Sequence, residues 1–510
     1  MTILKKVQNT KIYKESTKDE NIKYFDIKYK KFLHNTDNIY YSVYLENDTS
    51  YDVPGEILEF VENLKMYKEN FDQEYKDSFW YDHEKKILFT RKCAAKLYNL
   101  CLTVNGSFDI FIASSIPNDK TPRIHVQIRS ELLWSVGYNR AIQLSYDTVK
   151  HVLSQFDINI HQCKENRIDF AYHTNAIENP DKYFSDDNLN NHLVSSFKVG
   201  SKIFNFAPGK LDYNYLSLGM RTSNNVFFRT YNKTREVLDE SKKYYFFEVW
   251  LSCGLISFYD YHVYTYSKNH KKQYASLSFG MADFYINYGK DIYIKNKLIN
   301  LINNPNTNAT YLGTVVKELL PFPTQIINIE FQTMRKFYFT SENIIDSLTF
   351  RNDIIDDPLV RLFQILDNRK IFLDYLTNYT VCFRKYSTFT ADMDSPYLDF
   401  WDRLRKTKLE YIKDDTLVRN YPLAKNEIKI AEYNLRKALA RCSCLSGNID
   451  TDINQDFSVL MNMINDNNVN DEGIVTYIDE EYIRIKDKEK KKILKFQVAE
   501  PKKMKSSLSK

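Results

Sequence analysis

The chain of 510 residues contains no CxxC pair, no metal-finger spacing and no HxH pair. Its seven cysteines are odd in number and form no disulfide framework, which indicates a reducing, cytoplasmic environment. The first fifteen residues lack the apolar core of a secretory signal. The least charged stretch, 97–117, contains Asn, Ser, Thr, Gly and Asp109, which argues against a bilayer span. We therefore expect a soluble cytoplasmic protein with no membrane partner.

Charge is nearly balanced along the chain, with 71 basic and 66 acidic residues, but its distribution is uneven. Ten lysines and three acids between 486 and 510 give this tail a charge of +7, and the rest of the chain sums to −2. Such a tail either stays solvated or binds polyanions without sequence preference. We take Lys490, Lys491 and Lys492 as candidate DNA-binding residues in it.

The length and an apolar content of 43% favour about three domains with substantial cores. Residues 53–68 have the pattern of a helix within an otherwise polar N-terminal part, in which we find no chemistry. The predicted divisions are an N-terminal region at 1–80, a core at 81–350 with an insertion at about 255–320, a helical region at 351–470 and a basic tail at 471–510.

The core has the pattern of an antiparallel sheet. Two β-prone runs flank Asn105-Gly106, the dipeptide most typical of a tight hairpin turn. Further strands and one helix follow, an order that indicates an α+β fold with helices on one face of the sheet. The expected strands are 97–104, 107–114, 123–129 and 166–172, and the helix is 147–156.

Polar residues on two of the expected strands suggest a metal site. Strand side chains alternate, so Arg167 and Asp169 share one face beside the small Ala171. Glu330 lies on the polar face of the short run NIEFQT. If the two strands are neighbours, Asp169 and Glu330 converge, and two carboxylates suit Mg²⁺ or Mn²⁺. A solvent-facing strand edge is the alternative.

Glu248 competes with Glu330 for the role of metal ligand. Its surroundings have the pattern of an amphipathic helix with one charge at the border, which is the interpretation we prefer.

The stretch 213–237, YNYLSLGMRTSNNVFFRTYNKTREV, concentrates groups suited to phosphodiester chemistry. Covalent cleavage of DNA needs a phenol oxygen and fixed cations around the phosphate. Arg229 and Tyr231 lie on one face of a strand that ends just before a helix start. The chemistry-bearing residues of this stretch are Arg221, Ser223, Arg229, Tyr231, Lys233, Arg235 and Glu236.

Taken in order, the three segments RIDFAY, LSLGMRTSNNVFFRTYNKTRE and NIEFQTMRKFYF resemble the replication initiation factors of rolling-circle plasmids, phages and integrative elements, the Rep-trans relaxases. The resemblance covers about 85–410. This chain departs from the family pattern at three positions. Asn328 stands where Arg is usual, Met220 replaces a small residue, and His173 stands where a second Asp is expected.

The resemblance implies an α+β core related to the HUH fold, with a mainly helical C-terminal region. It also implies a nickase that cuts one strand at an origin and rejoins it, starting rolling-circle replication. Tyr231 would be the nucleophile, assisted by Arg221, Arg229 and Lys233, and Asp169 and Glu330 would hold the metal. Arg167, Ser223 and Arg235 would contact the DNA, the partner would be single-stranded or supercoiled origin DNA, and a host helicase is a further expected partner.

Two alternatives use the same fold. One is a conjugative relaxase of an integrative element, which has the same chemistry and different partners. The other is a DNA-binding protein that has lost turnover. The oligomeric state, with a dimer as one option, stays open.

Overall fold

The computed structural model describes residues 22–27, 30–74, 78–104, 106–197, 202–206, 213–220, 225–270, 274–339, 357–385, 395–407 and 409. The chain divides into two units, 1–420 and 421–510, and every described residue belongs to the first. The basic tail and its candidate lysines 490–492 lie outside the described residues. Within the described residues, no helix is both long and apolar enough to cross a membrane.

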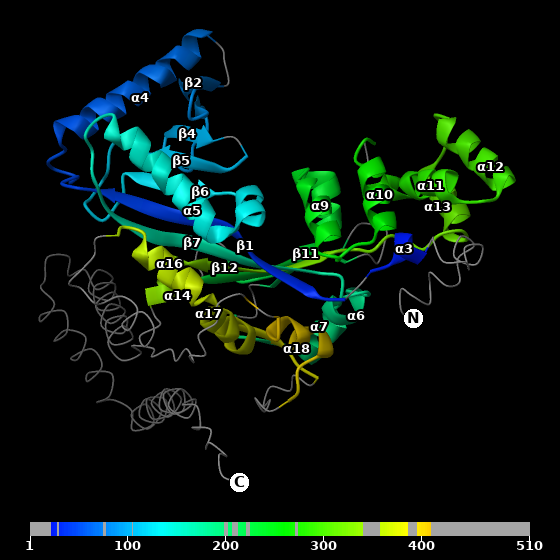
Figure 1. Ribbon diagram of the computed structural model, residues 1–510. Helices are drawn as coiled ribbons and strands as arrows, with labels where there is room; N and C mark the ends of the chain where they lie inside the picture. Colours follow the sequence, from blue (N-terminus) through cyan, green and yellow to red (C-terminus); the bar gives the residue numbers. More distant parts are fainter. Residues whose placement is uncertain are drawn as a thin grey trace, which may run out of the picture. The chain divides into compact units, whose positions relative to one another are not determined.

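One antiparallel sheet forms the frame of the described unit (Figure 1). It has eleven described strands in the order β2-β3-β4-β5-β6-β1-β7-β12-β11-β10-β9. The protein is therefore a mixed α/β structure with a large antiparallel sheet. The strands are β1 Phe32–Leu45, β2 Ser78–Asp82, β3 Ile87–Thr90, β4 Leu100–Val104, β5 Phe108–Ile112, β6 Ile124–Ile128, β7 Ile160–Thr174, β9 Lys202–Phe206, β10 Tyr213–Leu218, β11 Val226–Asn232 and β12 Ile327–Met334.

The predicted hairpin is present, because β4 pairs with β5 and Gly106 has φ +75° in the turn between them. Positive φ is cheap only for a residue without Cβ, so glycine suits this turn. The predicted helix at 147–156 is the end of a longer one, α5 Ser130–Ser154. Gly137, with φ 76° and ψ 166°, kinks α5 and separates its first turns from the rest.

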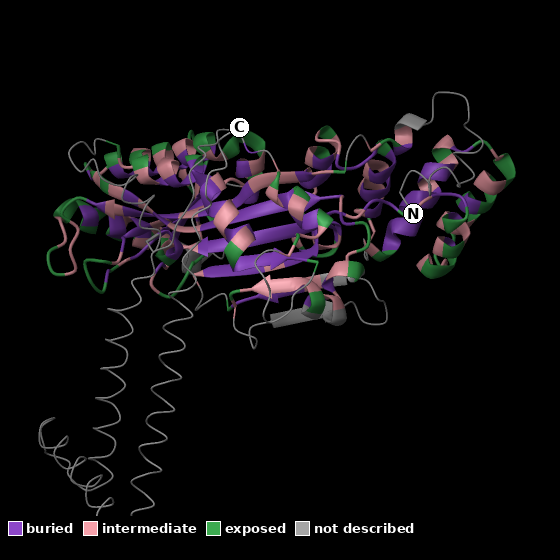
Figure 2. Cartoon of the chain, turned by 90° about the horizontal axis from the view of Figure 1, so that it is seen from below, coloured by how far each residue is buried: buried purple, intermediate pink, exposed green. Residues whose placement is uncertain are grey.

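Helices cover both faces of the sheet, so the expectation of helices on one face is wrong (Figure 1). The central strands carry buried side chains on both faces of the sheet (Figure 2), so each face needs a covering layer. Phe170 belongs to a core built with α4, α5, α16, α17 and α18. His173, on the other face of β7, contacts Trp250 of α9. The helices named are α4 Gly55–Glu74, α9 Tyr245–Ser252, α16 Val360–Asp367, α17 Arg369–Tyr375 and α18 Asp399–Arg405.

A second core is helical and lies mainly within 237–326, with Phe25 from the N-terminal part as a further buried member. Its helices include α10 Phe258–Ser267, α11 Leu277–Tyr288, α12 Ile292–Asn303 and α13 Ala309–Lys317. Buried Trp250, Tyr264 and Phe284 are among its members. This segment corresponds to the expected insertion at about 255–320, which stays a prediction together with the other domain boundaries.

The described parts of the C-terminal region, 357–385 and 395–407, are mainly helical. They also contain β13 Val381–Phe383, which pairs with β8 Leu193–Ser195 in a small second sheet. Trp401 of α18 and Phe372 of α17 are buried in the same core as the sheet. These residues therefore pack as one body with the strands that carry the predicted site.

A buried ion pair ties α16 to β7. Two guanidinium nitrogens of Arg361, Nε and Nη2, contact the Glu165 carboxylate, at 2.5 and 2.6 Å, and the Glu165 side chain is fully buried. Removing one partner of such a pair leaves an uncompensated charge in a low-dielectric environment, which costs more than losing the contact alone.

We predict that Arg361→Met lowers the free energy of unfolding by about 3–5 kcal/mol, because the Glu165 carboxylate is then buried alone. Urea unfolding followed by circular dichroism measures this change. The matched control is Lys406→Met, which removes a solvent-exposed partner of Asp402 and should cost at most about 0.5 kcal/mol. Equal effects of the two variants would show that the Glu165 pair does not hold α16.

Candidate active site

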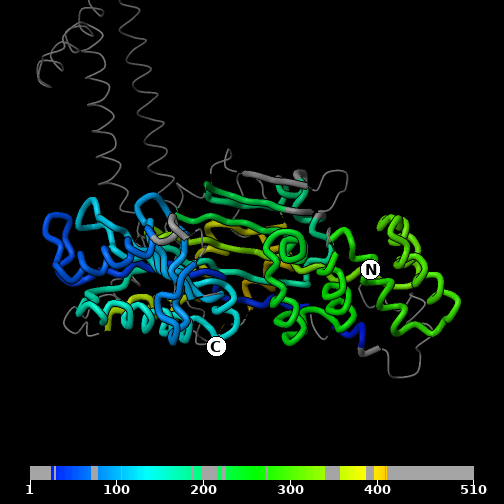
Figure 3. The backbone as a smooth tube through the Cα atoms, turned by 90° about the horizontal axis from the view of Figure 1, so that it is seen from above, coloured from blue at the N-terminus to red at the C-terminus, as the bar shows by residue number. Residues whose placement is uncertain are grey.

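The three segments that carry the predicted chemistry form neighbouring strands, with β12 between β7 and β11 (Figure 3). Glu330 is opposite Ala171 on one side and Arg229 on the other, and Gln332 is opposite Asp169. Asp169 and Glu330 therefore share a face and are diagonal neighbours. The strand pairing on which the sequence argument depended is present.

A tight cap places Lys233 back over Tyr231. The Asn232 side chain accepts a hydrogen bond from the Arg235 backbone N–H at 3.0 Å and so begins α8 Lys233–Arg235 directly after β11. The Lys233 backbone N–H donates to the Ile326 carbonyl at 2.8 Å, which fastens this turn to the segment before β12. Because the capped turn directly follows the end of β11, the side chains of Tyr231 and Lys233, two positions apart in the sequence, lie close together.

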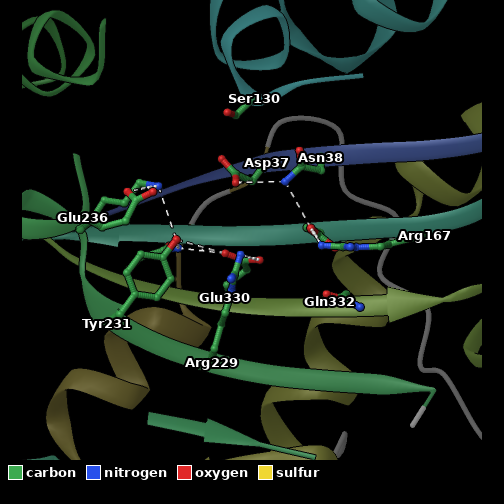
Figure 4. Close-up of polar contacts among 12 residues, drawn as sticks. Asp37, Asn38, Ser130, Arg167, Arg229, Tyr231, Glu236, Glu330 and Gln332 are labelled. Carbon is green, nitrogen blue, oxygen red and sulfur yellow. Dashed lines mark hydrogen bonds and ion pairs between the residues drawn. The ribbon is translucent and has the colours of Figure 1, made fainter. Parts of the chain in front are cut away.

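The Tyr231 phenol is surrounded by polar groups (Figure 4). Its oxygen accepts from Asn328 Nδ2 at 2.8 Å and from Lys233 Nζ at 3.4 Å, and it donates to Glu330 Oε2 at 3.4 Å. The side chain is only 8% exposed. Burial raises the pKa of Tyr231 well above its usual value, although Lys233 and Arg229 act in the opposite direction. The phenol is therefore protonated in the structure as it stands.

Arginine side chains neutralise both predicted metal ligands. Arg167 contacts the Asp169 carboxylate through two nitrogens, at 2.7 and 2.5 Å, and Asn38 donates to it at 3.3 Å. Arg229 donates to Glu330 Oε1 at 2.6 Å. Burial raises the pKa of Asp169, while the Arg167 cation opposes this shift.

These donors do not fit a preformed divalent-metal site. Within the described residues, no three His, Cys, Asp or Glu side chains are grouped so that they could hold a metal ion. The oxygens of Asp169 and Glu330 are already engaged by guanidinium and amide groups, and a cation would have to displace them. Mg²⁺ can be held by one or two carboxylates with water and substrate phosphates, so it is the engagement of both carboxylates, and not their number, that leaves no preformed site.

A pocket of about 320 Å³ opens beside the phenol. Three cations and three acids line it, so its charge is balanced at rest. Lys233 is paired with Glu236 at 2.9 Å. The lining residues are Asp37, Asn38, Tyr215, Arg229, Tyr231, Asn232, Lys233, Glu236, Glu240 and Lys243.

Asp37 is a site residue that the sequence argument missed, because it lies in the N-terminal part where we found no chemistry. β1 has a bulge between Thr36 and Asn38 that leaves Asp37 without a partner on β7. Bulges of this kind re-aim a side chain. The buried Asp37 carboxylate accepts from Trp134 Nε1 at 3.1 Å, and nearby Lys233 and Lys243 lower its pKa against the effect of burial. Only the pairing with β7 reveals the bulge, so no local sequence signal could have found it.

Of the remaining predicted site residues, Arg235 and Glu248 do not line the pocket. Arg235 is on α8, where its side chain lies over the Tyr274 ring and 3.9 Å from Asp239. Glu248 is exposed on α9 and accepts from the Tyr261 hydroxyl, away from the residues that line the pocket. Arg221 and Ser223 lie outside the described residues.

Among solved structures, the comparisons find similarity to this chain that is low in both sequence identity and TM-score. No family model matches the chain, and no curated protein matches it. A solved structure described as the rolling circle replication initiator protein from Geobacillus stearothermophilus is similar with a TM-score of 0.32 and 12% identity, over 73% of this chain and 95% of that one. A TM-score this low does not establish a shared fold, so the function proposed below rests on the geometry of the pocket.

His173 is fully buried and lies near Lys233 and Asp37, two of the residues that line this pocket. Its ring stacks on Trp134 at 4.5 Å, and its Nδ1 accepts from Trp250 Nε1 at 3.1 Å. Burial, followed by the Lys233 charge, holds the pKa of His173 well below its usual value, so the ring stays neutral in the folded protein.

We predict that this histidine makes the protein less stable in mild acid. Below pH 6.5 the unfolded chain gains a proton at His173 and the folded chain does not, so the free energy of unfolding falls by about 1.4 kcal/mol per pH unit from this group. Urea unfolding at pH 7.5, 6.0 and 5.0 measures the slope. In His173→Gln the fall in the free energy of unfolding per pH unit between pH 6.5 and 5 should be smaller by the contribution of one proton. An unchanged slope would contradict the assignment.

Proposed function

We propose that this protein is a replication initiator that nicks one strand of origin DNA through a covalent bond to Tyr231 and later rejoins it. The observation that carries the proposal is the convergence of three segments distant in sequence. Arg167 and Asp169 from β7, Glu330 from β12 and Arg229 with Tyr231 from β11 lie on one face of adjacent strands. These are the segments in which the sequence resembles the Rep-trans relaxases.

The residues around the Tyr231 phenol offer groups that a phosphate transfer would use. Tyr231 Oη would attack the scissile phosphorus, forming an O–P bond while the bond from phosphorus to the 3′ oxygen breaks. Glu330 Oε2, at 3.4 Å, is the nearest carboxylate to take the phenol proton. The products are a 5′-phosphotyrosyl link and a free 3′-OH, which receives a proton as it leaves. Attack by a 3′-OH on the link reverses the step and rejoins the strand without ATP.

The cations would stabilise the phosphate and the phenolate. Lys233 contacts the phenol oxygen, and Arg229 lies over the Tyr231 ring at 5.3 Å. Both cations are paired with acids at rest, so an entering phosphate would compete with Glu330 and Glu236 for them. Guanidinium groups can bind phosphate oxygens in a bidentate manner, and the lysine adds a point charge.

One observation favours a second candidate, a DNA-binding protein without turnover. The Tyr231 phenol is buried and its pKa is raised, which makes it a weak nucleophile until the pocket changes. A conjugative relaxase would use the same residues and would differ from the initiator in its partners. The partners we propose for the initiator are the origin DNA and a host helicase.

We predict that Tyr231→Phe abolishes nicking of a supercoiled origin plasmid, because the attacking oxygen is gone. Gel analysis of relaxation and of the protein–DNA adduct measures both products. The matched control is Tyr215→Phe, which removes the phenol oxygen of a residue that pairs with Tyr231 from β10 and lines the same pocket. This variant should still form the covalent adduct. Nicking and adduct at wild-type levels in Tyr231→Phe would disprove the role of Tyr231, and no nicking by any form would favour the binding protein.

The proposed need for Mg²⁺ or Mn²⁺ rests on the sequence alone. A metal at Asp169 and Glu330 has to replace Arg167 and Arg229, so no step is derived through it. On this proposal, Asp169→Asn and Glu330→Gln each abolish nicking and leave DNA binding largely intact, and excess EDTA stops the wild type. Glu248→Gln, which changes an exposed acid on α9, is the control and should stay active. Full activity in EDTA would show that the site works without a divalent metal.

A further inference from the structure

Two tyrosines of β1 carry cations over their rings. The Arg167 guanidinium lies 4.8 Å from the centre of the Tyr40 ring, and the Lys164 ammonium lies 4.8 Å from the centre of the Tyr44 ring. All four side chains are partly exposed. Cations at this distance are attracted by the ring faces and hold the rings in place.

These pairs lie on the face of the sheet that carries the candidate active site. Tyr40 is opposite Arg167, and Asn38, two positions earlier on β1, is opposite Asp169. Alternation brings Tyr44 to the same face as Tyr40, while Tyr41 and Val43 enter the core on the other side. From Asp169 to Lys164 the row follows β7 over a distance of roughly 17 Å, at about 3.4 Å per residue.

The far end of the row is positively charged. Arg335, just after β12, donates to the Tyr44 hydroxyl at 3.1 Å. Burial and the nearby charges of Arg335 and Arg361 lower the pKa of Lys164. The neighbouring acid, Glu165, enters the opposite face and is held by Arg361. An anion near Lys164 and Arg335 would relieve the repulsion between these cations.

We propose that Tyr40, Tyr44, Lys164 and Arg335 bind the single-stranded DNA that flanks the scissile phosphate. Rings stack on unpaired bases, and adjacent cations contact the phosphates between them, which is the combination that binds single strands without reading sequence. A duplex hides its bases from such rings, so paired DNA gains only the charge contacts. The inference deepens the proposed function, on which it rests, because the same strand would continue past Arg167 to Tyr231.

Binding and cleavage are separated by working with full-length Tyr231→Phe, which forms no covalent link. Fluorescence anisotropy with a labelled 20-nucleotide oligo(dT), and with a duplex of the same length, measures affinity across a salt series. We expect Tyr40→Ala and Tyr44→Ala each to weaken binding of the single strand about tenfold, within the range known for base–aromatic stacking, and to leave duplex binding nearly unchanged. Lys164→Gln should lower the salt slope by about one phosphate contact.

Three controls keep the result interpretable. Tyr51→Ala removes a tyrosine that is 94% exposed in a loop after β1, and affinity should not change. Tyr44→Phe keeps the ring and loses only the hydroxyl, with its hydrogen bonds to Arg335 and to the Lys120 carbonyl, so it should bind more tightly than Tyr44→Ala. Thermal melting shows whether each variant is folded.

The outcomes distinguish this inference from the proposed function. Unchanged affinity for the single strand in folded Tyr40→Ala and Tyr44→Ala overturns the inference, whether or not the wild type nicks DNA. Equal losses for single strand and duplex overturn it as well, because they show a charge effect without stacking. Selective loss for the single strand supports it even if Tyr231 proves to have no catalytic role.

Discussion

Compensation of charge inside a sheet is the constraint on which the candidate site depends. Arg229 with Glu330, Arg167 with Asp169, and Lys233 with Glu236 place opposite charges within hydrogen-bond distance on one largely buried face. Isolated charges could not be buried there, because each would lose its hydration without a partner. The pairing makes the resting pocket neutral and determines how a phosphate can enter, since it must take over a cation that already has a partner.

The strand order makes this compensation possible. Because β12 lies between β7 and β11, Glu330 has Arg229 directly opposite, while Asp169 lies one step away along the diagonal. Slipping β12 by one residue would turn Glu330 into the opposite apolar core and place Phe331 in the pocket. The apolar core on the other face of the sheet, which includes Phe170, Phe228 and Phe331, therefore maintains the register that the polar face needs.

Helices pack on both faces of the sheet. One set packs on the apolar side of the sheet, and α9 with the first turns of α5 closes the polar side over His173. The close packing explains why Tyr231 is buried and its pKa is raised. Any chemistry at this phenol has to begin with a change in its surroundings, since burial alone disfavours the phenolate.

Much of this could be predicted from local sequence. Alternation placed Arg167 with Asp169 and Arg229 with Tyr231, and Asn105-Gly106 predicted the hairpin between β4 and β5, because side-chain alternation and turn chemistry are local properties. The apolar pattern around Glu248 indicated a helix with a charge at its border, and α9 has that form.

Only the tertiary structure decided which strands are neighbours, that both faces of the sheet are covered, that Asp37 enters the pocket from a bulge in β1, and that arginines occupy the carboxylates expected to hold metal. Arg167 and Asp169 are only two positions apart, but the other contacts join residues between 77 and 196 positions apart. Such contacts are set by the packing of the whole domain, and no short stretch of sequence encodes them.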